Sequence, residues 1–224
     1  MRVVPAGQGR SSLKPASRSS SSETDTGAAL IVALLLTVLM AALGLGLVEL
    51  ASTERLIAAN FRAGQQAGYA ADAAVERSLE DLRPLPDWSG VLAGSTVSSF
   101  RDATLVPTLA TGRTLDILAE TAVLQRVSDA RHALGADDPV WRLFAYGPLD
   151  ALVSSGPPSS AYVVVWVADD RTETDGNPLA DSNGVAVLVA RAWVGRAVRT
   201  VEVALAKPAG GAAGVHVLAW RSVF

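Results

Sequence analysis

The chain opens with a polar segment and then carries a long apolar run. That run is Ala28–Val48, AALIVALLLTVLMAALGLGLV, in which Thr37 is the only polar residue. A helix of about 20 apolar residues is long enough to cross the hydrocarbon core of a bilayer. The sequence therefore predicts one membrane-spanning helix over residues 28–48.

The helical pattern continues past the apolar run. It persists through Glu49–Arg83 without a turn signal, and Pro84 and Pro86 then end it. We predict a single helix over residues 28–83 whose second half is amphipathic. Residues expected on its packed side are Leu56, Phe61, Gly68, Val75, Leu79 and Leu82. Residues expected on its wetter side are Glu54, Arg62, Gln65, Asp72, Glu76 and Glu80.

Residues 84–224 are predicted to form an exported α+β head domain with an antiparallel sheet. A second helix is expected over Thr114–His132, with Thr114 as its N-cap. The turn at Gly195-Arg196 predicts a hairpin between two of the strands. The expected strands are Trp141–Leu149, Ala161–Ala168, Val185–Val194, Ala197–Ala206 and Val215–Phe224.

The first 27 residues are rich in Ser, Gly and Pro, and we predict that they are disordered. They carry four basic and two acidic side chains, so the leader is positively charged. Because positive segments stay in the cytoplasm, the head is predicted to be exported. The whole chain has a net charge of −3, so the part after the leader is acidic, and no nucleic acid is expected as a partner. A cleaved secretory signal fits less well, because the apolar region of such a signal is shorter than the apolar run of this chain.

The region from Gly27 to Leu82 resembles the N-terminal region of PilX-type minor pilins of type IV pili. The similarity rests on the Gly27-Ala28 junction, the apolar run and the segment Ala59–Leu79, ANFRAGQQAGYAADAAVERSL. The positions that match the family signature are Asn60, Arg62, Ala70, Ala71, Asp72, Ala73 and Glu76. The resemblance implies a pilin-like fold, with a long N-terminal helix followed by the α+β head.

The resemblance also implies a pathway. A prepilin peptidase would cut after Gly27 and methylate the new amine of Ala28. The subunit would then move from the membrane lipid into a filament made with other pilins and pilus assembly proteins. Most pilins carry Glu at the fifth mature position, where this chain has Val32. Lack of that Glu is typical of subunits thought to cap or prime a pilus, and of the K-type pseudopilin of type II secretion.

The segment between the second and third predicted strands is acidic. It reads DDRTETDGNPLADSN over Asp169–Asn183, and its oxygen ligands are of the kind that Ca²⁺ prefers. The spacing does not fit an EF-hand, and a solvated turn-rich loop is the simpler interpretation. The candidate ligands are Asp169, Asp170, Glu173, Asp175, Asn177 and Asp181.

The sequence predicts no catalytic site. His132 and His216 are far apart, and the common nucleophile, phosphate-binding and zinc motifs are missing. No cofactor is expected to be required. The tryptophans are predicted to lie in the core and on sheet faces rather than to form a binding platform. These are Trp88, Trp141, Trp166, Trp193 and Trp220.

We therefore expect a structural minor pilin of the inner membrane, single-pass, with a periplasmic head that becomes extracellular in a pilus. A type II secretion minor pseudopilin is the alternative within the same group of proteins. The alternative from another class is a permanently anchored periplasmic binding domain. An enzyme is the least favoured interpretation.

Overall fold

The structure is a computed structural model, and it describes residues 22–131, 135, 137–152, 159–208 and 214–223. The chain divides into two compact units, Met1–Glu54 and Arg55–Phe224. Helix α1, Ser22–Leu82, contributes residues to both units. The helix begins six residues before the predicted start, so the end of the leader is helical. The predicted disorder of residues 1–21 lies outside the described residues.

In the first unit, the apolar side chains of α1 face outward. Leu30, Met40 and Leu45, for example, are 71%, 74% and 73% exposed. An 18-residue window of this helix has a mean hydropathy of 2.8, which is apolar enough to cross a membrane. Among the described residues, it is the one helix with this property. The prediction of one candidate membrane span is therefore confirmed by length and composition.

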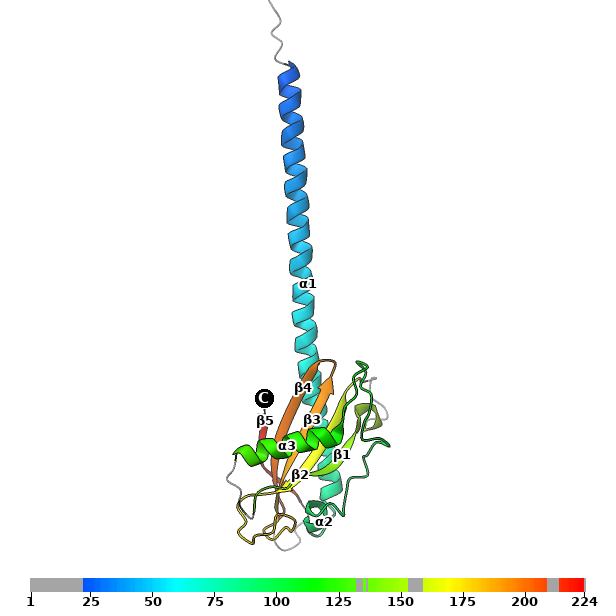
Figure 1. The fold of residues 1–224 in the computed structure, drawn as a ribbon, viewed down its shortest axis with the longest axis vertical. Coiled ribbons are helices and arrows are strands. Elements are labelled where there is room, and N and C mark those ends of the chain that lie inside the picture. The colour runs from blue at the N-terminus through cyan, green and yellow to red at the C-terminus, as the bar shows by residue number, and fades with distance from the viewer. Residues whose placement is uncertain (1–21, 132–134, 136, 153–158, 209–213, 224) are drawn as a thin grey trace, which may run out of the picture. The chain divides into compact units, whose positions relative to one another are not determined.

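The second unit is built on a five-stranded antiparallel sheet in the order β1-β2-β3-β4-β5 (Figure 1). Its strands agree closely with the predicted ones. They are β1 Arg142–Pro148, β2 Tyr162–Asp169, β3 Val185–Val194, β4 Ala197–Ala206 and β5 His216–Val223. Gly195, at φ 58°, occupies the tight turn between β3 and β4, which confirms the predicted hairpin.

Two helices cover opposite faces of the sheet (Figure 1). Val163, Val165 and Val167 of β2 join a core with α1, whereas Val164 and Trp166 join a second core with α3, Ile117–Arg131. Every residue of β2 is buried, because successive side chains enter the two cores in turn. This explains why β2 reads as an unbroken apolar run rather than as an alternating one.

Helix α3 differs in detail from the predicted helix. It begins three residues later than expected, and Asp116 caps it by accepting a hydrogen bond from the Ala119 N–H at 2.9 Å. Thr114 instead forms an isolated antiparallel bridge with Thr108, so its predicted capping role is wrong. His132, the predicted last residue of this helix, lies outside the described residues.

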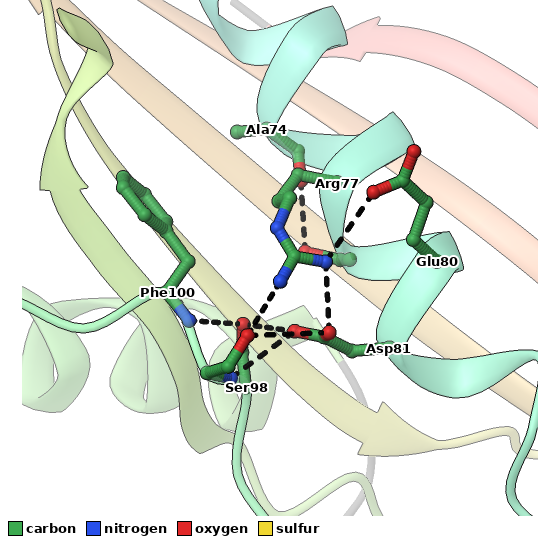
Figure 2. A network of polar contacts seen from close by, with 8 residues as sticks. Ala74, Arg77, Glu80, Asp81, Ser98 and Phe100 are labelled. Carbon is green, nitrogen blue, oxygen red and sulfur yellow. Dashed lines mark hydrogen bonds and ion pairs between the residues drawn. The ribbon is translucent and has the colours of Figure 1, made fainter. Parts of the chain in front are cut away.

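The segment between α1 and α3 contains the short helix α2, Ser89–Leu92. A polar network joins the part of this segment that follows α2 to the end of α1. Asp81 is the centre of this network (Figure 2). Its carboxylate pairs with Arg77 Nη1 at 2.8 Å, accepts the Ser98 hydroxyl, and accepts the Ser99 N–H at 3.2 Å. The network places Phe100 against β1, where it packs over Gly147. A short 3-10 helix, Leu149–Ala151, follows β1.

Candidate functional site

The acidic loop is anchored where β2 and β3 end their pairing. Asp169 is the last residue of β2 and pairs with Ala186 of β3. Asp170 follows it directly, and the loop returns to the sheet at Val185. The pairing of the two strands therefore holds both ends of the loop close together, at the same end of β2 and β3.

Three carboxylates of this loop converge. Asp169, Asp170 and Glu173 each offer one oxygen, and these oxygens all lie within 4.8 Å of one another. The three residues are only 2%, 6% and 5% exposed. Burying negative charges together is unfavourable unless each is hydrogen-bonded, protonated or paired with a cation.

Neutral donors satisfy part of this group. Asp169 Oδ1 accepts the Asp170 N–H at 2.9 Å. Asp170 Oδ1 accepts the Asn183 side-chain amide at 2.8 Å, and its other oxygen accepts both the N–H and the hydroxyl of Thr172. The two ends of the loop are thus joined through Asp170 and Asn183.

Glu173 is only half satisfied. Its Oε1 accepts the N–H groups of Ser182 and Asn183 at 2.9 and 2.8 Å. Its Oε2 is buried and has no hydrogen-bond partner. An unsatisfied buried carboxylate oxygen is costly, and in a native fold it points to an ion, a water or a shared proton.

The electrostatics of the cluster follow from this burial. Desolvation, followed by the charge of Glu173, raises the pKa of Asp169 to about 7. Burial also raises the pKa of Asp181, although hydrogen bonds from Gly184 and Trp88 oppose that effect. The site therefore favours any species that neutralises its negative charge.

Asp181 ties the loop to the segment that follows α1. Its Oδ2 accepts the Trp88 N–H at 3.1 Å, and its Oδ1 accepts the Gly184 N–H at 2.6 Å. The Asp181 N–H in turn donates to the Ser89 hydroxyl at 3.1 Å. Asp181 therefore acts as a tether between the loop and the start of α2.

The structure separates the six predicted ligands into groups. Asp169, Asp170 and Glu173 come together, whereas Asp181 is engaged with backbone N–H groups. Asp175 and Asn177 are exposed. Each accepts the N–H of the residue two positions on, at 2.9 and 3.3 Å, so each forms a turn rather than joining the buried cluster.

A cavity of about 710 Å³ lies beside this cluster, a feature that the sequence patterns did not indicate. Its walls come from α3, from strands β3, β4 and β5, and from Asp169. Arg191 lines it and is paired with Glu120 of α3, with Nη1 and Oε2 2.7 Å apart. His216 is exposed on β5, and His132 lies outside the described residues.

The tryptophans lie in the two cores and on a strand of the sheet, as the sequence predicts. Trp88, Trp141, Trp166 and Trp193 are at most 9% exposed and belong to the two cores. Trp220 on β5 is 40% exposed, and its side chain interacts with the Asp72 carboxylate of α1.

The packed side of the second half of α1 is lined mainly with alanine. Ala67, Ala70, Ala71 and Ala74 are at most 1% exposed and pack on the sheet together with three larger residues, Val75, Leu79 and Leu82. Leu56 and Phe61 were predicted on this side, but they are 64% and 66% exposed. The prediction failed there because those two residues precede the segment that meets the sheet.

The signature residues of α1, which the resemblance to pilins makes candidates for contacts in assembly, fall into two groups. Asn60, Arg62 and Glu76 are exposed, and Arg62 donates to the backbone oxygen of Ala58 at 3.2 Å within its own helix. Asp72 is half-buried against its own head. In the first unit, the processing residues Gly27 and Ala28 are exposed and helical, and Val32 is 55% exposed.

Residues 26–76 match the family model described as PilX N-terminal. This part of the chain is similar to the PilX N-terminal family. The match covers the apolar run and the alanine-rich face that packs on the sheet. The long helix and the antiparallel sheet that follows it form a pilin-like α+β architecture. No curated protein and no solved structure matches the chain significantly.

Proposed function

We propose that this protein is a structural minor pilin of a type IV pilus, present in few copies as a tip or priming subunit. The observation that supports this most strongly is the PilX N-terminal match, which spans the Gly27-Ala28 junction and the apolar helix. The protein would act by assembly with other pilins rather than by turnover of a substrate.

Val32 supports the choice of a tip or priming subunit. A carboxylate inside a bilayer is costly and is retained where it has a partner. The resemblance implies that the usual Glu pairs with the N-terminal amine of a neighbouring subunit. Val32 cannot form such a pair, so this subunit would not need to dock beneath another one.

Processing and orientation complete the proposal. A prepilin peptidase would cut after Gly27 on the cytoplasmic side and methylate Ala28. The positive charge of the leader favours its retention in the cytoplasm, which places the head in the periplasm before assembly. The protein would then be extracellular in the assembled filament.

The K-type pseudopilin of type II secretion is the second candidate, and Val32 is the observation that favours it. Both candidates share the same processing and the same kind of filament. They differ in the machine with which the subunit is isolated, so the partner proteins decide between them.

The test is filament assembly in cells that lack the natural gene and express wild type, V32E or V32L. We expect wild type and V32L to restore normal filament numbers and to place the subunit at filament ends in sheared preparations. We expect V32E either to fail to restore filament numbers or to place the subunit along the filament. Unchanged filaments without the protein, together with its absence from sheared filaments, would rule out the proposal.

A further inference from the structure

We propose that Asp169, Asp170 and Glu173 bind one calcium ion, which fixes the β2–β3 loop against the start of α2. This inference does not depend on the pilin function, because it concerns the chemistry of the head alone. It reduces the six predicted ligands of the acidic loop to three. Asp181 is not a ligand in this proposal, and it links the loop to the start of α2 by hydrogen bonds.

The first argument is the unsatisfied oxygen of Glu173. This residue is 5% exposed, and its Oε2 is buried without a hydrogen-bond partner. Oxygens of Asp169, Asp170 and Glu173 lie within 4.8 Å of one another. A cation placed among them would satisfy the Glu173 carboxylate and reduce the repulsion between the three charges.

The second argument is the chemistry of the donors. The three side chains offer only carboxylate oxygens, which are hard ligands suited to Ca²⁺ or Mg²⁺ rather than to soft metals. Ca²⁺ accepts six to eight oxygens in flexible geometry, whereas Mg²⁺ demands a near-ideal octahedron at about 2.0–2.1 Å. An irregular loop with three carboxylates therefore fits Ca²⁺ better, with water completing its coordination.

The third argument is what the ligands hold. Glu173 Oε1 accepts the N–H groups of Ser182 and Asn183, and Asp170 accepts the Asn183 amide. An ion bound to Glu173 and Asp170 would therefore fix both ends of the loop. Asp181 lies in the returning end and hydrogen-bonds the Trp88 N–H, so the constraint would reach α2.

A shared proton is the competing way to neutralise this group. A proton shared between the Asp169 and Glu173 carboxylates would lower the negative charge of the group without any metal. The two possibilities differ in one measurable respect, because only the metal site binds Ca²⁺ with a defined stoichiometry.

The primary test is equilibrium dialysis of ⁴⁵Ca²⁺ against the full chain in detergent micelles at neutral pH. We expect one ion per chain for wild type and loss of that ion in E173Q. The matched control is D175N, which removes one negative charge from the same loop at an exposed position outside the cluster. D175N is expected to bind one ion as wild type does.

Hydrogen exchange supplies a readout that does not rely on a variant folding. With calcium at 100 times its Kd, the Ser182 and Asn183 amides of wild type should exchange about 100-fold more slowly than in chelator, if exchange requires release of the ion. Absence of stoichiometric binding by wild type, or equal exchange with and without calcium, would overturn the proposal and favour the shared proton. Equal binding by E173Q would overturn the ligand assignment.

Discussion

The Trp220 side chain on β5 interacts with the Asp72 carboxylate on α1 and opposes the rise in the pKa of that carboxyl group. Asp72 is one of the positions that carry the resemblance to PilX-type minor pilins. In this structure Asp72 contributes to the contact between α1 and the sheet of the same chain. Asn60, Arg62 and Glu76 differ from it, because their side chains are exposed.

The Asp72–Trp220 contact predicts a specific pH dependence. Burial raises the pKa of Asp72, and the hydrogen bond from Trp220 opposes that rise. A carboxyl group whose pKa is higher in the folded state than in the unfolded state makes the folded protein less stable as the pH rises from the unfolded-state pKa through the folded-state pKa. D72N lacks this loss, so its melting temperature should gain on wild type as the pH rises above the ordinary pKa of Asp, about 3.9, and should level off once the folded-state pKa is passed.

The control for this prediction is W220F. Removing the indole N–H takes away the interaction that favours the charged carboxylate, so the pKa of Asp72 should rise further. The stability of W220F should fall more steeply with pH than that of wild type. Thermal unfolding of the full chain in detergent across the pH range measures both effects. Parallel curves for all three proteins would show that the contact carries no charge dependence.

The Asp81 network predicts a strong effect of a single carboxylate on the stability of the head (Figure 2). D81A would leave the Ser98 hydroxyl and the Ser99 N–H without their acceptor and would remove the shorter of the two ion pairs of Arg77. We expect a loss of about 1–3 kcal/mol in the free energy of unfolding. Chemical denaturation of the full chain in detergent checks this value.

Glu80 offers a matched control in the same helix turn. Its carboxylate lies 3.4 Å from Arg77 Nη1, but its side chain is 64% exposed. Exposed ion pairs contribute at most about 1 kcal/mol, so E80A should have little effect. Equal losses in D81A and E80A would mean that Asp81 does not organise the segment that leads to Phe100.

Phe100 packs so closely over Gly147 that a larger residue at position 147 would clash with its ring. A Cβ atom at this glycine would lie 2.8 Å from Phe100 Cζ and 3.1 Å from Cε2, and Phe100 is itself 9% exposed. G147A should therefore destabilise the head by about 1–3 kcal/mol through overpacking. G68A is the control, because a Cβ built there in α1 meets nothing within 4 Å apart from its own stretch of helix. It should stabilise the helix by about 1 kcal/mol in the same denaturation experiment.

Much of the fold follows from local patterns. The apolar run, the proline stop after Arg83 and the β-branched runs sufficed to predict the long helix and the five strands. The boundaries of β3 and β4 match the predicted residues, because the two-residue turn at Gly195 fixes their register. The end of the leader was missed because its polar residues Ser22–Thr26 resemble a disordered segment, yet they continue the helix.

The candidate site was harder to predict. The acidic composition of the loop pointed to oxygen ligands, but it could not distinguish Glu173, which is buried, from Asp175, which is exposed two residues later. That distinction depends on how the returning end of the loop folds back, through Ser182 and Asn183, onto Glu173. The tether from Asp181 to Trp88 joins residues distant in sequence, and local spacing carries no signal for it.

The mature N-terminus tests the central claim most directly. The chain would be expressed in cells with and without a prepilin peptidase, and its N-terminal peptide would be read by mass spectrometry. The account predicts N-methylated Ala28 as the first residue in cells with the peptidase and an uncut Gly27-Ala28 bond in cells without it. An intact Met1 in both strains, or a cut at another bond, would contradict the pilin account and favour a permanently anchored binding domain.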